Sequence, residues 1–172
     1  MGTLNLGAGA QFVGSANGLT DAPTGTIIQT AIQGIASNVT APNDGSFTDV
    51  LSVSFTPRRS NSKIIYTLMF NAYFYNQNHN NGASYRILRD GSEIKVGDWC
   101  FYMHASEYNR DFYPTVSIFD FDEPGTTNTV TYKMQGRKYG GNSLHFPTVF
   151  GEPQHSSHVG NSVIMKLEEL SV

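Results

Sequence analysis

The sequence predicts an all-β protein, an antiparallel β-sandwich of jelly-roll type with an extended N-terminal arm. Three observations favour this fold class. Charged residues make up only 15% of the 172-residue chain, whereas it contains 17 glycines and nine tyrosines, a composition typical of strands and turns. About eight short segments alternate apolar and polar residues between turn signals. No long amphipathic helical pattern interrupts them, and a jelly roll is the commonest arrangement of eight antiparallel strands.

Residues 1–25 are expected to form an arm outside the core. They contain five large apolar residues scattered among glycines, without the periodicity of a helix or a strand. Such side chains cost about 1.5–3 kcal/mol each if they stay in water, so a partner surface is expected to bind them. The alternative is a flexible tail with incidental hydrophobic residues. The five residues are Leu4, Leu6, Phe12, Val13 and Leu19.

Residues 26–172 are expected to form the sandwich domain, and its first half contains the clearest alternation. Residues 26–34 fit either a helix or a strand, and their threonines and short length favour a strand. Leu51, Val53 and Phe55 are expected to share one face of the next strand. A single long strand is predicted at 64–75, followed by a polar loop at 76–82.

The second half of the domain continues the antiparallel pattern. A hairpin is predicted at 85–96 because Asp90 and Gly91 are a favoured tight-turn pair. Further strands are predicted at 115–121, 129–135 and 162–170, with a possible short one at 144–146. Val163, Met165 and Leu167 are expected to point inward in the last strand. Residues 99–113 and 137–161 are interpreted as loops.

Apolar residues on outer faces indicate self-association. The strand predicted at 64–75 carries aromatic residues, including Tyr73 and Tyr75, on the face that a monomer would expose. Burial between identical subunits is the simpler interpretation, and threefold closure suits a sandwich of this kind. A homotrimer is therefore expected.

Composition and charge argue against several classes of partner. The formal net charge of −3 gives no footprint for a nucleic acid backbone. No apolar run approaches the roughly 18 residues of a membrane span, and residue 1 does not open a signal-peptide pattern, so synthesis in a cytoplasm is expected. Cys100 is the only cysteine, so it is expected to be a small buried hydrophobe rather than part of a disulfide.

Two patterns of polar residues suggest chemistry, and each has a simpler explanation. His155 and His158, with Glu152 nearby, have a spacing that zinc could use, but a solvated loop is preferred because nothing fixes the ligands. Asp120 and Asp122 would share a strand face, as paired glycosidase carboxylates could, but edge and turn residues explain them better. The sequence therefore predicts no enzyme, no metal and no cofactor.

An aromatic and polar segment is the strongest candidate for a glycan or subunit contact. Aromatic faces beside planar polar groups suit sugars, while the preferred interpretation is a long surface loop packed on the sandwich or on a neighbouring subunit. The candidate residues are Trp99, Tyr102, His104, Tyr108, Arg110 and Tyr113.

Residues 26–172 contain a series of short motifs in order. They are the sequence FTDV at 47–50, a strand that ends in Thr56 and Pro57, NSKII at 61–65, ILRDG at 87–91, TVTYKMQ at 129–135 and the last strand at 162–170. Together they resemble small β domains of tailed-bacteriophage particles. The opening residues 2–7 are also similar to the start of such proteins. The resemblance implies a trimeric jelly roll located in the virion, made in the host cytoplasm, and it brings no catalytic residues.

Two functions follow from this resemblance. The leading hypothesis is a capsid decoration (cement) protein that binds the major capsid protein through the arm and stabilises the head. The alternative is a tail-fibre or tail-tip receptor-binding domain that recognises host surface glycan. Tail fibres commonly have a long shaft before such a domain, so the short arm favours decoration.

Overall fold

The computed structural model describes residues 22–35, 39–42, 45–71, 73–76, 81–103, 110–112, 114–139, 144–146 and 163–172, and these residues contain strands and no helix. The predicted all-β class is confirmed. The strands are β1 (Ile27–Ile35), β2 (Val39–Thr40), β3 (Thr48–Phe55), β4 (Lys63–Asn71), β5 (Tyr73–Asn76), β6 (Asn81–Arg89), β7 (Ser92–Met103), β8 (Arg110–Phe112), β9 (Thr115–Asp122), β10 (Val130–Tyr139), β11 (Leu144–Phe146) and β12 (Val163–Leu170).

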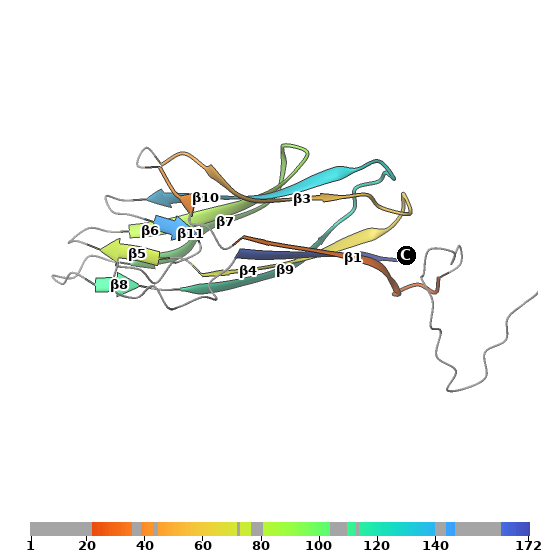
Figure 1. Ribbon diagram of the computed structural model, residues 1–172, viewed down its shortest axis with the longest axis horizontal. Coiled ribbons are helices and arrows are strands. Elements are labelled where there is room, and N and C mark those ends of the chain that lie inside the picture. Colours follow the sequence, from red (N-terminus) through yellow and green to blue (C-terminus); the bar gives the residue numbers. More distant parts are fainter. Residues whose placement is uncertain are drawn as a thin grey trace, which may run out of the picture.

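Two antiparallel four-stranded sheets pack face to face as a sandwich. One has the order β1–β12–β4–β9 and the other β3–β10–β6–β7, and they form the lower and upper layers of Figure 1. The pairs β1–β12, β3–β10, β4–β9 and β6–β7 are nested one inside the next along the chain. A long antiparallel ribbon rolled into two sheets has this arrangement, so the domain is a jelly roll.

A third antiparallel sheet has four short strands. Its order, β2–β11–β5–β8, repeats β1–β12–β4–β9 with each strand replaced by its neighbour in the chain. The labels of β5, β8 and β11 lie together at one end of the sandwich in Figure 1. The strand predicted at 64–75 is therefore two strands, β4 and β5, that belong to different sheets.

The core lies between the two sheets and follows the period of two that the sequence displays. In β10 every second residue from Val130 to Lys138 is buried, and β4 buries Ile64, Tyr66, Leu68 and Phe70 in the same way. Side chains alternate between the faces of a strand, so each strand contributes one row to the core. The ring of Phe70 meets that of Tyr85 from the other sheet edge to face, with centroids 6.2 Å apart.

The predicted Asp90–Gly91 turn is confirmed between β6 and β7. Both residues have positive φ, 49° and 85°, as a two-residue hairpin turn of type I′ requires. The Asp90 carboxylate accepts a hydrogen bond from the Thr131 backbone N–H at 2.7 Å, and the Asp90 N–H donates to the Thr131 carbonyl at 3.0 Å. The turn is thereby fastened to β10.

The start of the described chain is fixed to its end. The Gly25 N–H donates to the Ser171 carbonyl at 2.8 Å, and the Ser171 N–H donates to the Thr26 carbonyl at 2.9 Å. The Ser171 hydroxyl also donates to the Pro23 carbonyl. These contacts, together with buried Ala22, define the arm root, residues 22–26.

Several predicted segment boundaries were wrong, including those of the loop predicted at 76–82, whose residues 76, 81 and 82 are strand. The predicted hairpin strand at 93–96 is the start of β7, which continues to Met103, and β10 extends to Tyr139, beyond the predicted end at 135. Residues 99–103 and 110–112 were interpreted as part of a loop, but they are strand. In β7 the register with β6 shifts between Ala83 and Tyr85, which breaks the alternation that would have revealed the strand.

Candidate functional site

The predicted contact residues fall into two groups. Trp99 and Tyr102 lie on β7, and Arg110 lies on β8. Tyr102 is opposite Gly82 of β6, and Arg110 is opposite Asn76 of β5. The other predicted contact residues lie outside the described residues: His104, Tyr108 and Tyr113, and the arm residues Leu4, Leu6, Phe12, Val13 and Leu19.

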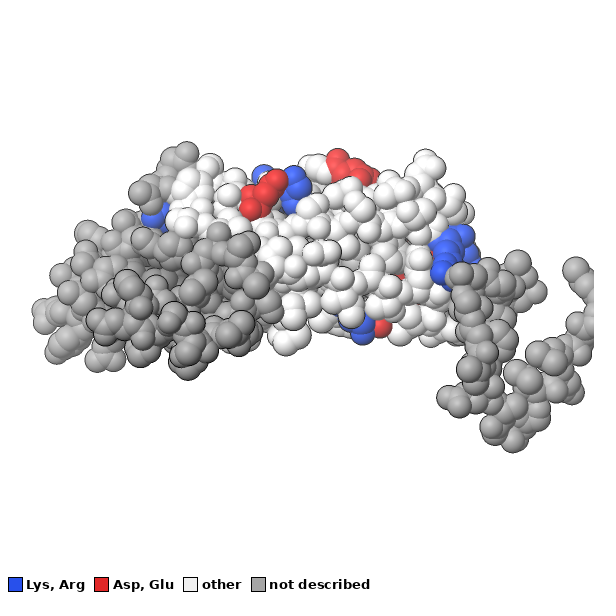
Figure 2. All heavy atoms as spheres, in the orientation of Figure 1, with Lys and Arg blue, Asp and Glu red and all other residues white. Residues whose placement is uncertain are grey.

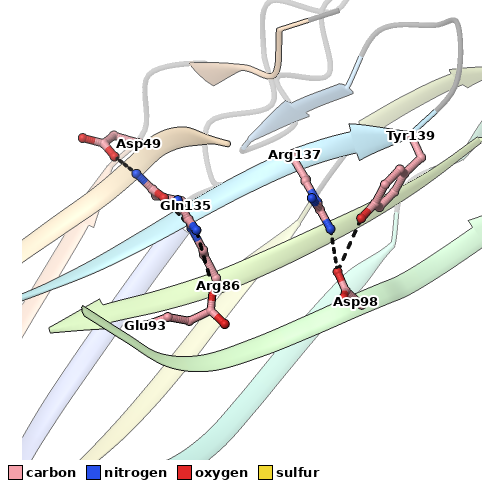
Figure 3. Close-up of polar contacts among 7 residues, drawn as sticks. All are labelled: Asp49, Arg86, Glu93, Asp98, Gln135, Arg137 and Tyr139. Carbon is pink, nitrogen blue, oxygen red and sulfur yellow. Dashed lines mark hydrogen bonds and ion pairs between the residues drawn. The ribbon is translucent and has the colours of Figure 1, made fainter. Parts of the chain in front are cut away.

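A polar network crosses the outer face of the β3–β10–β6–β7 sheet from edge to edge (Figure 3). Asp49 of β3 accepts hydrogen bonds from Lys133 at 2.6 Å and from Gln135 at 2.5 Å, both of β10. The Gln135 side-chain oxygen accepts from Arg86 of β6 at 2.7 Å, and Arg86 pairs with Glu93 of β7 at 3.5 Å. The hydrogen bonds from Gln135 and Lys133 lower the pKa of Asp49.

A second branch of the network surrounds two arginines and an aromatic ring. Arg137 donates to Asp98 of β7 at 2.9 Å, and Tyr139 lies 3.4 Å from the same carboxylate. The guanidinium carbons of Arg86 and Arg137 lie 4.1 Å and 4.5 Å from the centre of the Phe47 ring. Hydrogen bonds from Ser84 and Arg137 lower the pKa of Asp98.

The charges on this face are therefore paired within it. Its cations pair with carboxylates from other strands of the same sheet, and each such exposed pair contributes about 0–1 kcal/mol. The buried Nε of Arg137 is the one side-chain polar atom without a hydrogen-bond partner among the buried atoms of the described residues. Stacking of Arg137 on Phe47 holds that atom out of water. The face supports cross-strand register rather than a preformed ligand site.

Asp122 belongs to a polar cluster between the sheets at one end of β9. It accepts two hydrogen bonds from Arg89 at 2.7 and 2.8 Å, and one from the Tyr132 hydroxyl at 2.8 Å. Burial, and then this bond to Asp122, raise the pKa of Tyr132. The cluster joins β9 of one sheet to β6 and β10 of the other.

Asp120 forms a neighbouring bridge between the same sheets. It accepts from Lys95 of β7 at 2.5 Å and from the Phe121 backbone N–H at 2.9 Å. It also hydrogen-bonds the buried Tyr66, whose pKa is raised by burial and then by the charge of Asp120. Asp120 and Asp122 do share a strand face, as the sequence indicated, and each is engaged by a cation. This geometry gives both carboxylates a structural role.

The Asp120 bridge predicts a specific acid sensitivity. The Lys95 hydrogen bond lowers the pKa of Asp120 below the ordinary value of an aspartate. A carboxyl whose pKa is lower in the folded state stabilises the fold above its unfolded pKa, and this contribution is lost as the pH falls through the folded pKa. As the pH is lowered below about 4, the melting temperature is therefore expected to decrease, and this decrease should be less steep in Asp120→Asn.

Thermal melts between pH 6 and pH 2 measure the slope, which is the decrease of the melting temperature per unit of pH. Lys95→Met should reduce the slope as Asp120→Asn does, and the double variant should reduce it no further, because both changes remove the same bond. Identical slopes for the wild type and Asp120→Asn would contradict the prediction.

The metal and membrane expectations concern different parts of the chain. Within the described residues, no three His, Cys, Asp or Glu side chains are grouped as metal ligands. His155 and His158 lie outside those residues.

Cys100 is partly buried against the core, and its thiol donates to the Ala83 carbonyl at 3.2 Å. In the described part of the chain there is no helix long and apolar enough to cross a membrane.

Comparisons with known proteins yield structural neighbours only. No protein-family model matches the chain, and no curated protein does. A structure of infectious bursal disease virus, Gx strain, matches 85% of this chain and 37% of its own, with 11% identity and a TM-score of 0.37. The VP2 subviral particle of infectious bursal disease virus matches 86% and 39%, with 9% identity and a TM-score of 0.34.

The chain thus spans less than two-fifths of either neighbour. Both identities and both TM-scores are too low to assign a function. The jelly-roll assignment rests on the strand order of the two sheets.

Proposed function

We propose that the chain is a non-enzymatic structural protein of a tailed-bacteriophage particle, a homotrimeric decoration protein that binds the capsid through its N-terminal arm. The jelly-roll strand order supports the proposal, because viral capsid domains are a common use of this architecture. The sequence segments that resemble phage β domains support it independently.

The observation that carries the proposal is the fixed root of an apolar arm. Residues 22–26 are hydrogen-bonded to Ser171, so the point on the domain to which an arm would be joined is fixed. Twenty-one extended residues reach at most roughly 70 Å. The arm can therefore reach a neighbouring capsid subunit while the sandwich stays where it is.

Binding by the arm explains stabilisation of a head without any enzymatic step. Burial of each large apolar arm residue contributes about 1.5–3 kcal/mol. Three arms on one trimer bind as a linked set, so the second and third contacts form at high effective concentration. Trimers would join adjacent capsid subunits and oppose the outward pressure of packaged DNA.

Deletion of residues 1–20 tests the proposal, because the arm root keeps all its hydrogen bonds to Ser171. The melting temperature of the truncated protein is expected to lie within about 2 °C of that of the wild type. The truncated protein should no longer bind purified phage heads from which the wild-type protein is absent. Band intensity after sedimentation of the mixed heads measures occupancy.

A full-length control separates the apolar side chains from the mere length of the arm. Serine at Leu4, Leu6, Phe12 and Val13 should abolish occupancy, whereas serine at the polar residues Asn5, Gln11 and Asn17 should preserve it. Wild-type occupancy by the truncated protein would refute the arm's role. Quantitative mass spectrometry of whole particles then distinguishes a head protein from a tail protein, because a decoration protein is present in many more copies per particle than a tail fibre.

A further inference from the structure

The outer face of the β1–β12–β4–β9 sheet, here called the apolar face, exposes most of the large hydrophobic side chains on the described surface. Six of the eight such residues lie on it, and Phe119 and Ile32 are 74% and 65% exposed. Isolated exposed hydrophobic residues need no explanation, but a group on one sheet does. The six are Ile27, Ile32, Met69, Phe119, Phe121 and Ile164.

Strand register makes this group one continuous patch. Ile164 of β12 is directly opposite Met69 of β4, and Thr67 of β4 is opposite Phe119 of β9. Phe121 follows two residues along β9, beside Ile65. Residues opposite each other, or diagonal by two, lie within about 4.5–8 Å. Each of the four strands therefore contributes apolar side chains that neighbour one another along diagonals, with Lys166 and Thr67 between Ile32 and Phe119 in one row.

The charges on the apolar face are few and already paired. Lys63 forms an ion pair with Glu123 at 3.2 Å and also lies 4.6 Å from the centre of the Phe121 ring. Lys166 pairs with Glu168 at 2.7 Å. These two cations and two anions leave the apolar face neutral. In Figure 2 most of the visible charged side chains of the described residues lie along the upper margin, over the other sheet.

The extent of the apolar face suits a protein interface. Four strands spaced about 4.8 Å apart and eight residues long cover roughly 500 Å² in plan. A stable interface buries about 800 Å² on each partner, so the apolar face can supply the larger part of such an interface.

We propose that the apolar face is covered by other copies of this chain. The inference rests on the proposed self-association and names its surface. A second copy presents the same neutral mixture of apolar side chains and internally paired lysines and glutamates, so two such faces can meet without net repulsion. A strongly charged partner would find no matching charge here. Capsid binding is assigned to the arm, which leaves the apolar face free for copies of the chain.

Sedimentation equilibrium of the purified protein without heads tests the proposal. The wild type is expected at a multiple of the 18.9 kDa chain mass, and Phe119→Asp at the mass of one chain. A charge in the centre of such an interface should weaken association about 30-fold or more. Phe119 contributes little to the core because it is largely exposed, and Met69→Lys provides a second substitution if Phe119→Asp fails to fold.

Val96→Asp is the matched control. Val96 is 44% exposed on the outer face of the other sheet, opposite Arg86, so this variant should keep the wild-type mass. A monomeric wild type at 100-fold the concentration used for head binding, or an unchanged mass in both Phe119→Asp and Met69→Lys, would overturn the proposal. Head occupancy plays no part in this measurement, so its outcome is separate from that of the arm experiment.

Discussion

Replacement of Glu169 by alanine is expected to lower the free energy of unfolding by about 3–5 kcal/mol. The Glu169 side chain of β12 is fully buried, at 0% exposure. Its carboxylate accepts hydrogen bonds from the backbone N–H groups of Arg58 and Arg59 at 2.9–3.0 Å. It also accepts from the Ser62 hydroxyl and the Gln29 amide, both at 2.6 Å.

Four donors from two other segments therefore depend on this carboxylate. Three of them belong to the β3–β4 connection, and the fourth belongs to β1. Alanine would remove the acceptor of these hydrogen bonds and create a cavity, and each buried group left unsatisfied costs about 1–3 kcal/mol. Glutamine fills the volume but turns an N–H group toward other donors, so roughly half of the loss is expected for Glu169→Gln.

Urea unfolding followed by circular dichroism measures this loss at a fixed protein concentration. Glu93→Ala is the control, because Glu93 is an exposed carboxylate paired with Arg86 at 3.5 Å, and it should change stability by less than about 1 kcal/mol. A loss below about 1 kcal/mol in Glu169→Ala would show that the Glu169 carboxylate does not hold the connection.

The second large loss of stability is expected when a single methyl group is added at Gly97. Gly97→Ala should cost about 2–3 kcal/mol. Gly97 of β7 lies opposite Tyr85 of β6, and a Cβ there would overlap the Cε1 and Cζ atoms of the Tyr85 ring. That ring is buried against Phe70, so it cannot move aside without disturbing the core.

A double-mutant cycle tests this steric explanation. Tyr85→Ala removes the ring and is itself destabilising, but Gly97→Ala added to it should cost less than about 0.5 kcal/mol. Equal costs of Gly97→Ala in the two backgrounds would mean that backbone conformation, rather than the Tyr85 ring, requires glycine at this position.

Alternation along the sequence predicted the strands wherever a strand is regular. It placed Val163, Met165 and Leu167 inward, and all three are fully buried. Continued by one step, the same alternation points Glu169 inward, so a signal for this buried carboxylate was present. Glu169 lies near the end of the strand, where a glutamate is normally expected at the surface.

The composition of the apolar face and the partners of the buried polar residues depended on pairings between distant segments. Alternation within β4 predicted an exposed outer face, but the contributions of Ile32, Phe119 and Ile164 to that face follow from register with β12 and β9. A period of two tells which residues share a face, whereas the order of strands depends on long-range packing. The partners of Asp120 and Asp122 were unpredictable for the same reason, since Lys95 and Arg89 belong to the opposite sheet.

The nested strand pairs set the order in which the chain can fold. The β6–β7 hairpin closes a two-residue turn, whereas Thr26 and Ser171, which join at the arm root, are 145 residues apart. Closing a long loop costs more entropy than closing a short one, and contacts of high sequence separation form slowly. We expect pairing to proceed outward from β6–β7 and to end with β1–β12. The arm would then gain its anchor in the last step, so that an incompletely folded chain has no fixed arm to offer a partner.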